Sequence, residues 1–130
     1  MSDTLVDTSG WVAFLRGEEA AVRRIGPLLA DGRAAVTGPI AAEVLSGARS
    51  RRDFDILKSL LDGLDQLEEP ASLWERVAEL RFALARSGYQ ASLIDLTIAL
   101  SSLDAGHTLL TRDADFRRIQ AVVPMELEVF

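Results

Sequence analysis

The chain has 130 residues, of which 48% are apolar, and its 20 acidic and 14 basic side chains give a formal net charge of −6. This composition supplies the core of one domain and excludes intrinsic disorder. The absence of cysteine excludes disulfides, zinc thiolate sites and a cysteine nucleophile, and the single histidine, His107, excludes a multi-histidine metal centre.

The sequence shows no signal-peptide pattern and no membrane span. The longest nearly apolar run, residues 93–100, contains Asp95 and is far shorter than the roughly 20 residues that a spanning helix needs. We therefore expect a soluble, cytoplasmic protein with no membrane contact. Because the net charge is negative, any binding of nucleic acid requires a local basic patch or a bound cation.

Short apolar runs alternate with helical patterns along the whole chain. Asp7, Thr8 and Ser9 each offer an N-cap for the first helix, and Pro39 suits the first turn of a later one. In chain order the pattern predicts a strand at 5–6, helices at 11–17 and 19–30, a strand at 34–37, helices at 38–47 and 51–61, a strand at 64–67, helices at 72–87 and 92–103, a strand at 108–111, a helix at 114–119 and a strand at 125–130.

This alternation predicts a three-layer α/β/α fold, with a mostly parallel central sheet flanked by helices and one domain over residues 1–130. The helix at 92–103 is apolar nearly all round, which predicts that it is buried. In folds of this class, ligands bind beyond the carboxyl ends of the strands. The residues that follow each strand are therefore the candidates for function.

Four acids are placed to meet at that edge. Asp7 and Asp113 directly follow predicted strands, whereas Glu43 and Asp95 lie near the starts of helices in apolar surroundings. Such a cluster is self-repelling, because two unit charges about 4 Å apart interact by roughly 4 kcal/mol at an effective dielectric constant near 20. Hard divalent cations that prefer oxygen ligands, Mg²⁺ or Mn²⁺, are the natural counter-charge.

Each acid also has a purely structural interpretation. Asp95 fits a capping box with Ser92, and Asp113 fits the N-cap of the short helix that follows it, with Asp115 a solvated neighbour. Glu43 has the weakest structural alternative, because an unpaired carboxylate inside an apolar helical stretch is costly to bury.

Four sequence blocks carry a family resemblance as an ordered set. The blocks are 6–9 (Val-Asp-Thr-Ser), 42–48 (Ala-Glu-Val-Leu-Ser-Gly-Ala), 94–99 (Ile-Asp-Leu-Thr-Ile-Ala) and 110–116 (Leu-Thr-Arg-Asp-Ala-Asp-Phe). In this order, and spread across essentially the whole chain, they resemble the signature of PIN-domain ribonucleases, specifically the VapC toxins of bacterial and archaeal toxin–antitoxin pairs.

The resemblance implies a site and a reaction. Its acidic residues would hold one or two Mg²⁺ or Mn²⁺ ions, with Asp115 able to supply or share the fourth carboxylate, and Ser9 would contact a metal-bound water or a phosphate. The implied reaction is hydrolysis of an RNA phosphodiester by metal-activated water, which needs no histidine base. The implied partners are an RNA substrate, a second copy of the chain in a homodimer, and a cognate VapB-like antitoxin that blocks the acidic pocket. We call the four acids the acidic quartet: Asp7, Glu43, Asp95 and Asp113.

Substrate capture requires positive charge near the acidic quartet. Arg49, Arg51 and Arg52 follow the helix that carries Glu43 and form the best candidate patch, and Arg16 and Arg112 lie near the same edge. A solvated helix start explains the three clustered arginines equally well, and Arg112 also has the alternative role of damping repulsion beside its acidic neighbour.

Other functions fit the sequence less well. Trp11 and Trp74 could stack bases, but their helical spacing favours the core or an interface, and His107, just before a strand, reads as a turn residue. A phosphoacceptor receiver domain needs a lysine after a late strand, whereas the only lysine, Lys58, lies in a predicted helix. Neither nucleotide-binding glycine motif occurs. A PIN-like protein that binds RNA without cutting it remains the alternative, against which the four carboxylates count.

Overall fold

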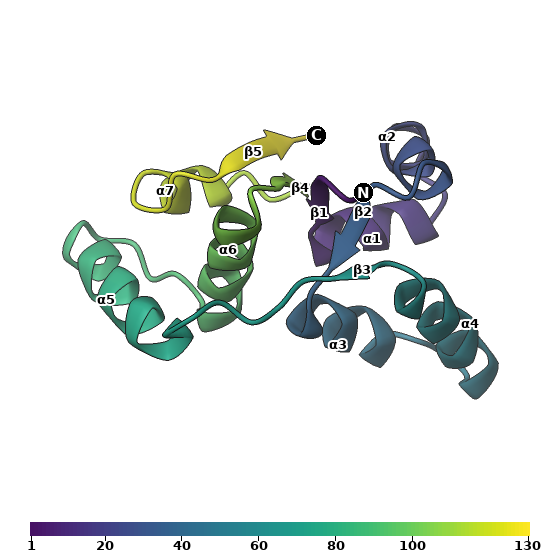
Figure 1. Cartoon of the computed structure of the whole chain (residues 1–130), viewed down its shortest axis with the longest axis horizontal. Helices are drawn as coiled ribbons and strands as arrows, with labels where there is room; N and C mark the ends of the chain where they lie inside the picture. The colour runs from purple at the N-terminus through teal and green to yellow at the C-terminus, as the bar shows by residue number, and fades with distance from the viewer.

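A five-stranded parallel sheet forms the centre of the molecule, in the order β3-β2-β1-β4-β5 (Figure 1). The computed structural model describes residues 1–130. All four neighbouring pairs of strands are parallel, which confirms the predicted parallel sheet and places every carboxyl end at one edge. The strands are β1 (Thr4–Val6), β2 (Ala34–Val36), β3 (Asp65–Gln66), β4 (Thr108–Thr111) and β5 (Glu126–Val129).

Helices cover both sides of this sheet. In Figure 1, α5, α6 and α7 lie to one side of the strands and α1 and α2 to the other, so the predicted three-layer arrangement is confirmed. None of the helices is long and apolar enough to cross a membrane. The helices are α1 (Thr8–Leu15), α2 (Glu19–Ala30), α3 (Gly38–Ser46), α4 (Arg51–Asp62), α5 (Leu73–Arg86), α6 (Leu93–Ala105) and α7 (Phe116–Gln120).

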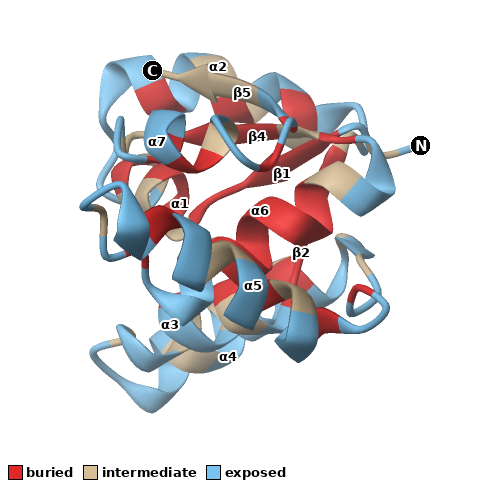
Figure 2. Ribbon diagram, turned by 90° about the vertical axis from the view of Figure 1, so that its left-hand side faces the viewer, coloured by how far each residue is buried: buried red, intermediate tan, exposed pale blue.

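The core lies between the sheet and the apolar faces of these helices. Helix α6 is buried over the continuous stretch 96–102, as its apolar sequence predicts, and stands out as buried in Figure 2. Trp11 is completely buried, so its assignment to the core is confirmed and it cannot stack on a base. Trp74, in contrast, is 60% exposed on α5.

Helix α1 begins directly after β1, and a glycine makes this abrupt turn possible. A Cβ atom at Gly10 would lie 2.9 Å from Cγ1 of Val6, a side chain that is fully buried. Glycine therefore lets the first turn of α1 pack against the strand that precedes it. The result is that Asp7, the single residue between β1 and α1, is held at the carboxyl edge of the sheet.

Most predicted boundaries differ from the structure by one to three residues, and the largest difference is at the first helix, which begins at Thr8 instead of residue 11. The strand predicted at 64–67 shortens to Asp65–Gln66, because only this stretch pairs with β2 at the edge of the sheet. The last helix begins at Phe116 instead of residue 114, because the backbone N–H of Asp115 bonds to the Asp113 carboxylate at 2.9 Å and holds a turn there.

Candidate active site

The carboxyl edge of the sheet collects the acidic quartet. Asp7 follows β1, Asp113 follows β4, and Asp95 lies in the first turn of α6. The pKa of Asp95 is raised to about 6, first by burial and then by the negative charge of Asp7; the hydrogen bond with Ser92 opposes this shift, and Asp113 and Glu43 add smaller increases. Asp95 is therefore within electrostatic reach of the other three carboxylates, although all four come from separate parts of the chain.

Asp7 is the most tightly held member of the quartet. The residue is only 6% exposed, and the hydroxyls of Ser9 and Thr111 both donate to its Oδ2 atom at 2.9 Å. Its backbone N–H donates to the carbonyl of Leu110 at 2.9 Å, continuing the pairing of β1 with β4. Strand pairing and two hydroxyls thus fix the position of this carboxylate.

Glu43 corrects one expectation from the sequence. We expected this residue in buried, apolar surroundings, but it is exposed, because the buried side of α3 is formed by Ile40 and Val44. Its Oε1 atom accepts a hydrogen bond from the hydroxyl of Thr8 at 3.1 Å. Contact with the start of α1, and not burial, holds this carboxylate.

Asp113 and Asp115 share the loop between β4 and α7. The Asp113 carboxylate is not the N-cap of α7. It stabilises the turn by accepting from the backbone N–H of Asp115, the exposed residue that directly precedes the helix. The pKa of Tyr89 is raised first by burial and then by the charges of Asp115, Asp95 and Asp113, so both loop acids lie near the same site.

The capping interpretation of Asp95 explains the hydrogen bond that its backbone N–H makes. Its N–H donates to the hydroxyl of Ser92 at 3.0 Å, which caps α6 as the sequence predicts. The carboxylate itself stays half-buried and faces like charges, which a cap alone does not require. Capping and participation in the acidic quartet therefore coexist in this residue.

The oxygen donors at this edge suit a hard cation. Carboxylates and hydroxyls are present, whereas the only histidine lies elsewhere, so the donors match Mg²⁺ or Mn²⁺ and not a softer metal. No three acidic or histidine side chains lie close enough together to hold an ion by themselves. The residues fit a cation that binds one or two carboxylates directly and completes its coordination with water, which is the usual arrangement for Mg²⁺.

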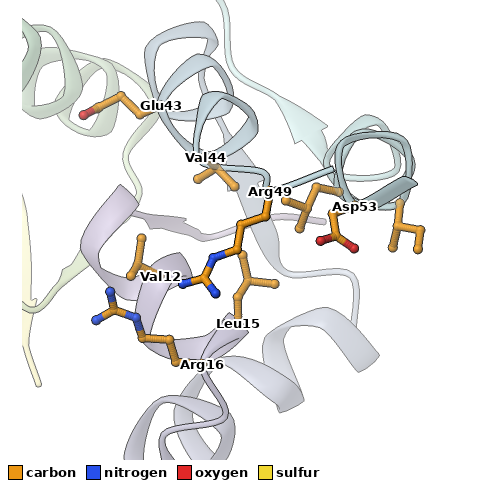
Figure 3. A pocket seen from close by; sticks show the side chains of 10 residues that line it. Val12, Leu15, Arg16, Glu43, Val44, Arg49 and Asp53 are labelled. Carbon is orange, nitrogen blue, oxygen red and sulfur yellow. The ribbon is translucent and has the colours of Figure 1, made fainter. Parts of the chain in front are cut away.

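A groove of about 620 Å³ adjoins the acidic quartet at Glu43, between α1, α3 and α4 (Figure 3). Its apolar lining comes from all three helices, and two arginines, Arg16 and Arg49, line it as well. Figure 3 shows the Arg49 guanidinium reaching toward α1, the helix that Arg16 directly follows. Neither guanidinium takes part in an ion pair, whereas seven of the 14 basic side chains do.

The candidate arginine patch does not act as one unit in the structure. Arg49 lines the groove, but Arg51 pairs with Asp55 at 3.2 Å and lies over the ring of Phe54. Arg52 is exposed and lies outside the groove. The solvated helix start therefore describes Arg51 and Arg52 better than it describes Arg49.

Arg112 lies near the acidic quartet but is largely committed to structural contacts. Its guanidinium lies over the ring of Phe130 at 4.7 Å and is 3.8 Å from the carboxylate of Glu18. Its backbone N–H donates to the hydroxyl of Ser9 at 3.0 Å. The backbone of Arg112 thus contributes to the site through Ser9.

Comparison with known proteins identifies the family. The family profile of the PIN domain matches residues 4–122. A VapC ribonuclease of Mycobacterium bovis, Mb1587, is 33% identical over 132 residues, covering 97% of this chain and 98% of the relative. Ribonuclease VapC21 of Mycobacterium tuberculosis is 33% identical over 120 residues, covering 89% of this chain and 87% of that protein. The chain belongs to the VapC ribonuclease family of PIN domains.

Solved structures show the same PIN-domain fold. VapBC2 from Rickettsia felis, bound to a DNA fragment from its promoter, matches with a TM-score of 0.75 at 21% identity and covers 98% of both chains. DNA-bound VapBC from Salmonella typhimurium matches with a TM-score of 0.75 at 19% identity, covering 99% of this chain and 98% of that one. At these identities the likeness concerns the fold alone.

In this VapC-family chain, His107 lies at the opposite edge of the sheet from the acidic quartet. It directly precedes β4, and its ring nitrogens contact the carbonyl of Ala105 at 3.0 Å and the hydroxyl of Ser2 at 2.8 Å. These contacts agree with its interpretation as a turn residue.

Sequence reasoning overlooked two residues beside the candidate site. Thr111 lies at the end of a short apolar strand, where a β-branched residue signals only strand propensity. Tyr89 lies in the connection between α5 and α6, and the Arg118 guanidinium lies 5.0 Å from the centre of its ring. No local pattern points to either residue, because tertiary structure brings each of them near the acids.

Proposed function

We propose that this chain is the ribonuclease toxin of a toxin–antitoxin pair and that it cleaves RNA phosphodiester bonds with Mg²⁺ or Mn²⁺. One or two carboxylates of the acidic quartet would bind the cation directly and the others through its water ligands, and Asp115 would supply or share the fourth carboxylate. The observation that carries the proposal is the electrostatic coupling of Asp95 to the other three acids at the carboxyl edge. Family membership agrees with the reaction.

The chemistry divides between the cation and the protein. When bound, the cation lowers the pKa of a coordinated water and neutralises charge on the phosphoryl oxygens. The chain supplies the geometry: Asp7 is fixed by two hydroxyls, and Glu43 is held by Thr8. Without a cation the four negative charges would repel an RNA phosphate, so binding of the substrate and of the cation are expected to be coupled.

RNA capture would use the groove beside Glu43. We propose that the unpaired guanidinium groups of Arg49 and Arg16 bind phosphates next to the cleaved bond. Arg51, Arg52 and Arg112 would add a weaker, longer-range attraction, because Arg51 and Arg112 are already partnered and Arg52 lies outside the groove. The hydroxyl of Ser9 would act through Asp7, which it contacts directly, and not by binding phosphate itself.

The proposed assembly is a homodimer bound by a VapB-like antitoxin. Structural relatives of this chain are complexes named VapBC, which supports a partner of this class. Trp74 and Phe82 are 60% and 62% exposed on α5 and provide an apolar surface suited to burial in an assembly. We further propose that residues 1–130 form a single PIN domain and that the protein acts in the cytoplasm.

Metal-dependent RNA cleavage tests this function. The purified protein should cleave a generic single-stranded RNA in the presence of Mg²⁺ or Mn²⁺ and lose that activity in EDTA. Asp7→Asn should abolish cleavage, whereas Asp62→Asn should retain it, because Asp62 is an exposed partner of Lys58 on α4. Cleavage that survives EDTA or Asp7→Asn would contradict the proposal, as would RNA binding without cleavage.

A further inference from the structure

One hydroxyl links two members of the acidic quartet. Thr111, the last residue of β4, is completely buried, and β4 pairs with β1, the strand that Asp7 follows. The Thr111 hydroxyl donates to Asp7 Oδ2 at 2.9 Å and accepts from the backbone N–H of Asp113 at 3.0 Å. A single side chain therefore connects the acid after β1 to the acid after β4.

The hydroxyls of Ser9 and Thr111 each have their donor and acceptor positions occupied. A hydroxyl has one hydrogen to donate. Ser9 and Thr111 both donate to Asp7 Oδ2, so the 3.1 Å contact between their two oxygens is not an additional hydrogen bond. The Ser9 oxygen accepts from the backbone N–H of Arg112 at 3.0 Å. Each hydroxyl thus bridges a backbone N–H of the loop after β4 to the same carboxylate oxygen.

The two oxygens of Asp7 consequently differ. Oδ2 receives both hydroxyls, whereas Oδ1 accepts no hydrogen bond from the protein. Oδ1 is also not among the buried polar atoms that lack a partner. It is therefore the oxygen left accessible at the carboxyl edge, and the two hydroxyls prevent the carboxylate from rotating away.

We propose that Thr111 is a positioning residue, whose hydroxyl orients Asp7 Oδ1 and holds the Asp113 loop so that both acids address the same cation. This inference rests on the proposed function, because it assumes that the acidic quartet binds a divalent ion. Groups that hydrogen-bond to metal-binding carboxylates fix their orientation, and removing such groups typically weakens metal binding about 10- to 100-fold.

The test measures Mn²⁺ binding in the absence of RNA, using electron paramagnetic resonance of free Mn²⁺. Thr111→Val keeps the side-chain shape but removes the hydroxyl, and we expect it to weaken Mn²⁺ binding about 10-fold or more. Thr111→Ser restores the hydroxyl and should bind nearly as well as the original chain. Thr4→Val is the matched control, because Thr4 is also buried in the sheet and bonds an aspartate, Asp3, at the opposite edge.

The outcomes separate this inference from the proposed function. Thr111→Val that binds Mn²⁺ as the original chain does, with only a lower melting temperature, would show a merely structural role and overturn the inference. If Thr111→Val does not fold, Ser9→Ala tests the same arrangement, and unchanged Mn²⁺ binding there would equally overturn it. Failure of the original chain to bind Mn²⁺ would overturn the proposed function itself.

Discussion

The hydroxyl of Thr8 donates a hydrogen bond to Oε1 of Glu43 at 3.1 Å. The contact joins the first residue of α1 to the middle of α3, two helices that pack against each other. Glu43 is exposed, so the hydrogen bond with Thr8, the residue next to Asp7, fixes the direction of its carboxylate. The acidic quartet is therefore held by a hydrogen bond between two helices as well as by the pairing of strands.

Neutralising Asp95 should stabilise the metal-free protein at neutral pH. Its pKa is raised from 3.8 to about 6, so ionisation of the carboxylate opposes folding. The free-energy cost of ionising Asp95 in the folded state is absent below the unfolded pKa, grows as the pH rises, and reaches its full value above the folded pKa. We expect Asp95→Asn to raise the free energy of unfolding by about 1 kcal/mol at pH 7.5 in EDTA, after allowance for solvent screening of a half-buried group.

The control for this prediction is the same pair of proteins at lower pH. Near pH 3, below the ordinary pKa of 3.8, Asp95 is largely protonated in both the folded and unfolded states, so urea denaturation of the two proteins should give nearly equal stabilities. An Asp95→Asn variant that is less stable than the original chain at pH 7.5 would show that the carboxylate acts mainly as part of the cap of α6.

Removing the two groove arginines should weaken RNA binding more than it slows cleavage. The Arg16→Ala/Arg49→Ala double variant is expected to raise KM for RNA about 10-fold and to change kcat little, because the lost contacts are to neighbouring phosphates and not to the phosphate that reacts. Steady-state kinetics at several salt concentrations measures this effect. The dependence of affinity on salt should become shallower.

Arg51→Ala is the matched variant for the groove, because Arg51 is already paired with Asp55. It should raise KM much less than the double variant does. Equal effects of the two changes would indicate that general positive charge, and not the groove, captures the RNA.

Adding a methyl group at Gly10 should destabilise the fold despite the better helix propensity of alanine. The new Cβ would lie 2.9 Å from the buried Val6 side chain, and overpacking of this kind costs about 1–3 kcal/mol. Gly26→Ala in α2 is the control, because nothing lies within 4 Å of its added Cβ, and it should be neutral or stabilising by up to about 1 kcal/mol. Thermal denaturation compares the two, and equal melting temperatures would contradict this account of the β1–α1 turn.

Most helices and strands were predictable from the sequence, because the apolar periodicity and the capping residues that mark them are local features. Helix α2 spans Glu19–Ala30 as predicted, and β4 spans Thr108–Thr111. The predicted start of α7 was wrong because the hydrogen bond from the backbone N–H of Asp115 to the Asp113 carboxylate stabilises a turn that composition does not distinguish from a helix.

The site was predictable in part, because strand ends and helix starts of a parallel sheet share one edge. The exposure of Glu43 was not predictable from the sequence, because it depends on which side of α3 faces the core. Ile40 and Val44 lie on the side that does. Arg49 lies in the connection between α3 and α4 and reaches the groove through tertiary packing, whereas Arg51 pairs with Asp55 one turn along the same helix.

The most direct measurement of the central claim is the position of Mn²⁺ in crystals of this protein, located by anomalous scattering. The account predicts a Mn²⁺ peak at the carboxyl edge of the sheet, in contact with Asp7 Oδ1 and at least one other acid of the quartet, and loss of that peak in Asp7→Asn. A peak found only elsewhere, such as beside the exposed Glu68 and Glu69, or no peak at saturating Mn²⁺, would contradict it.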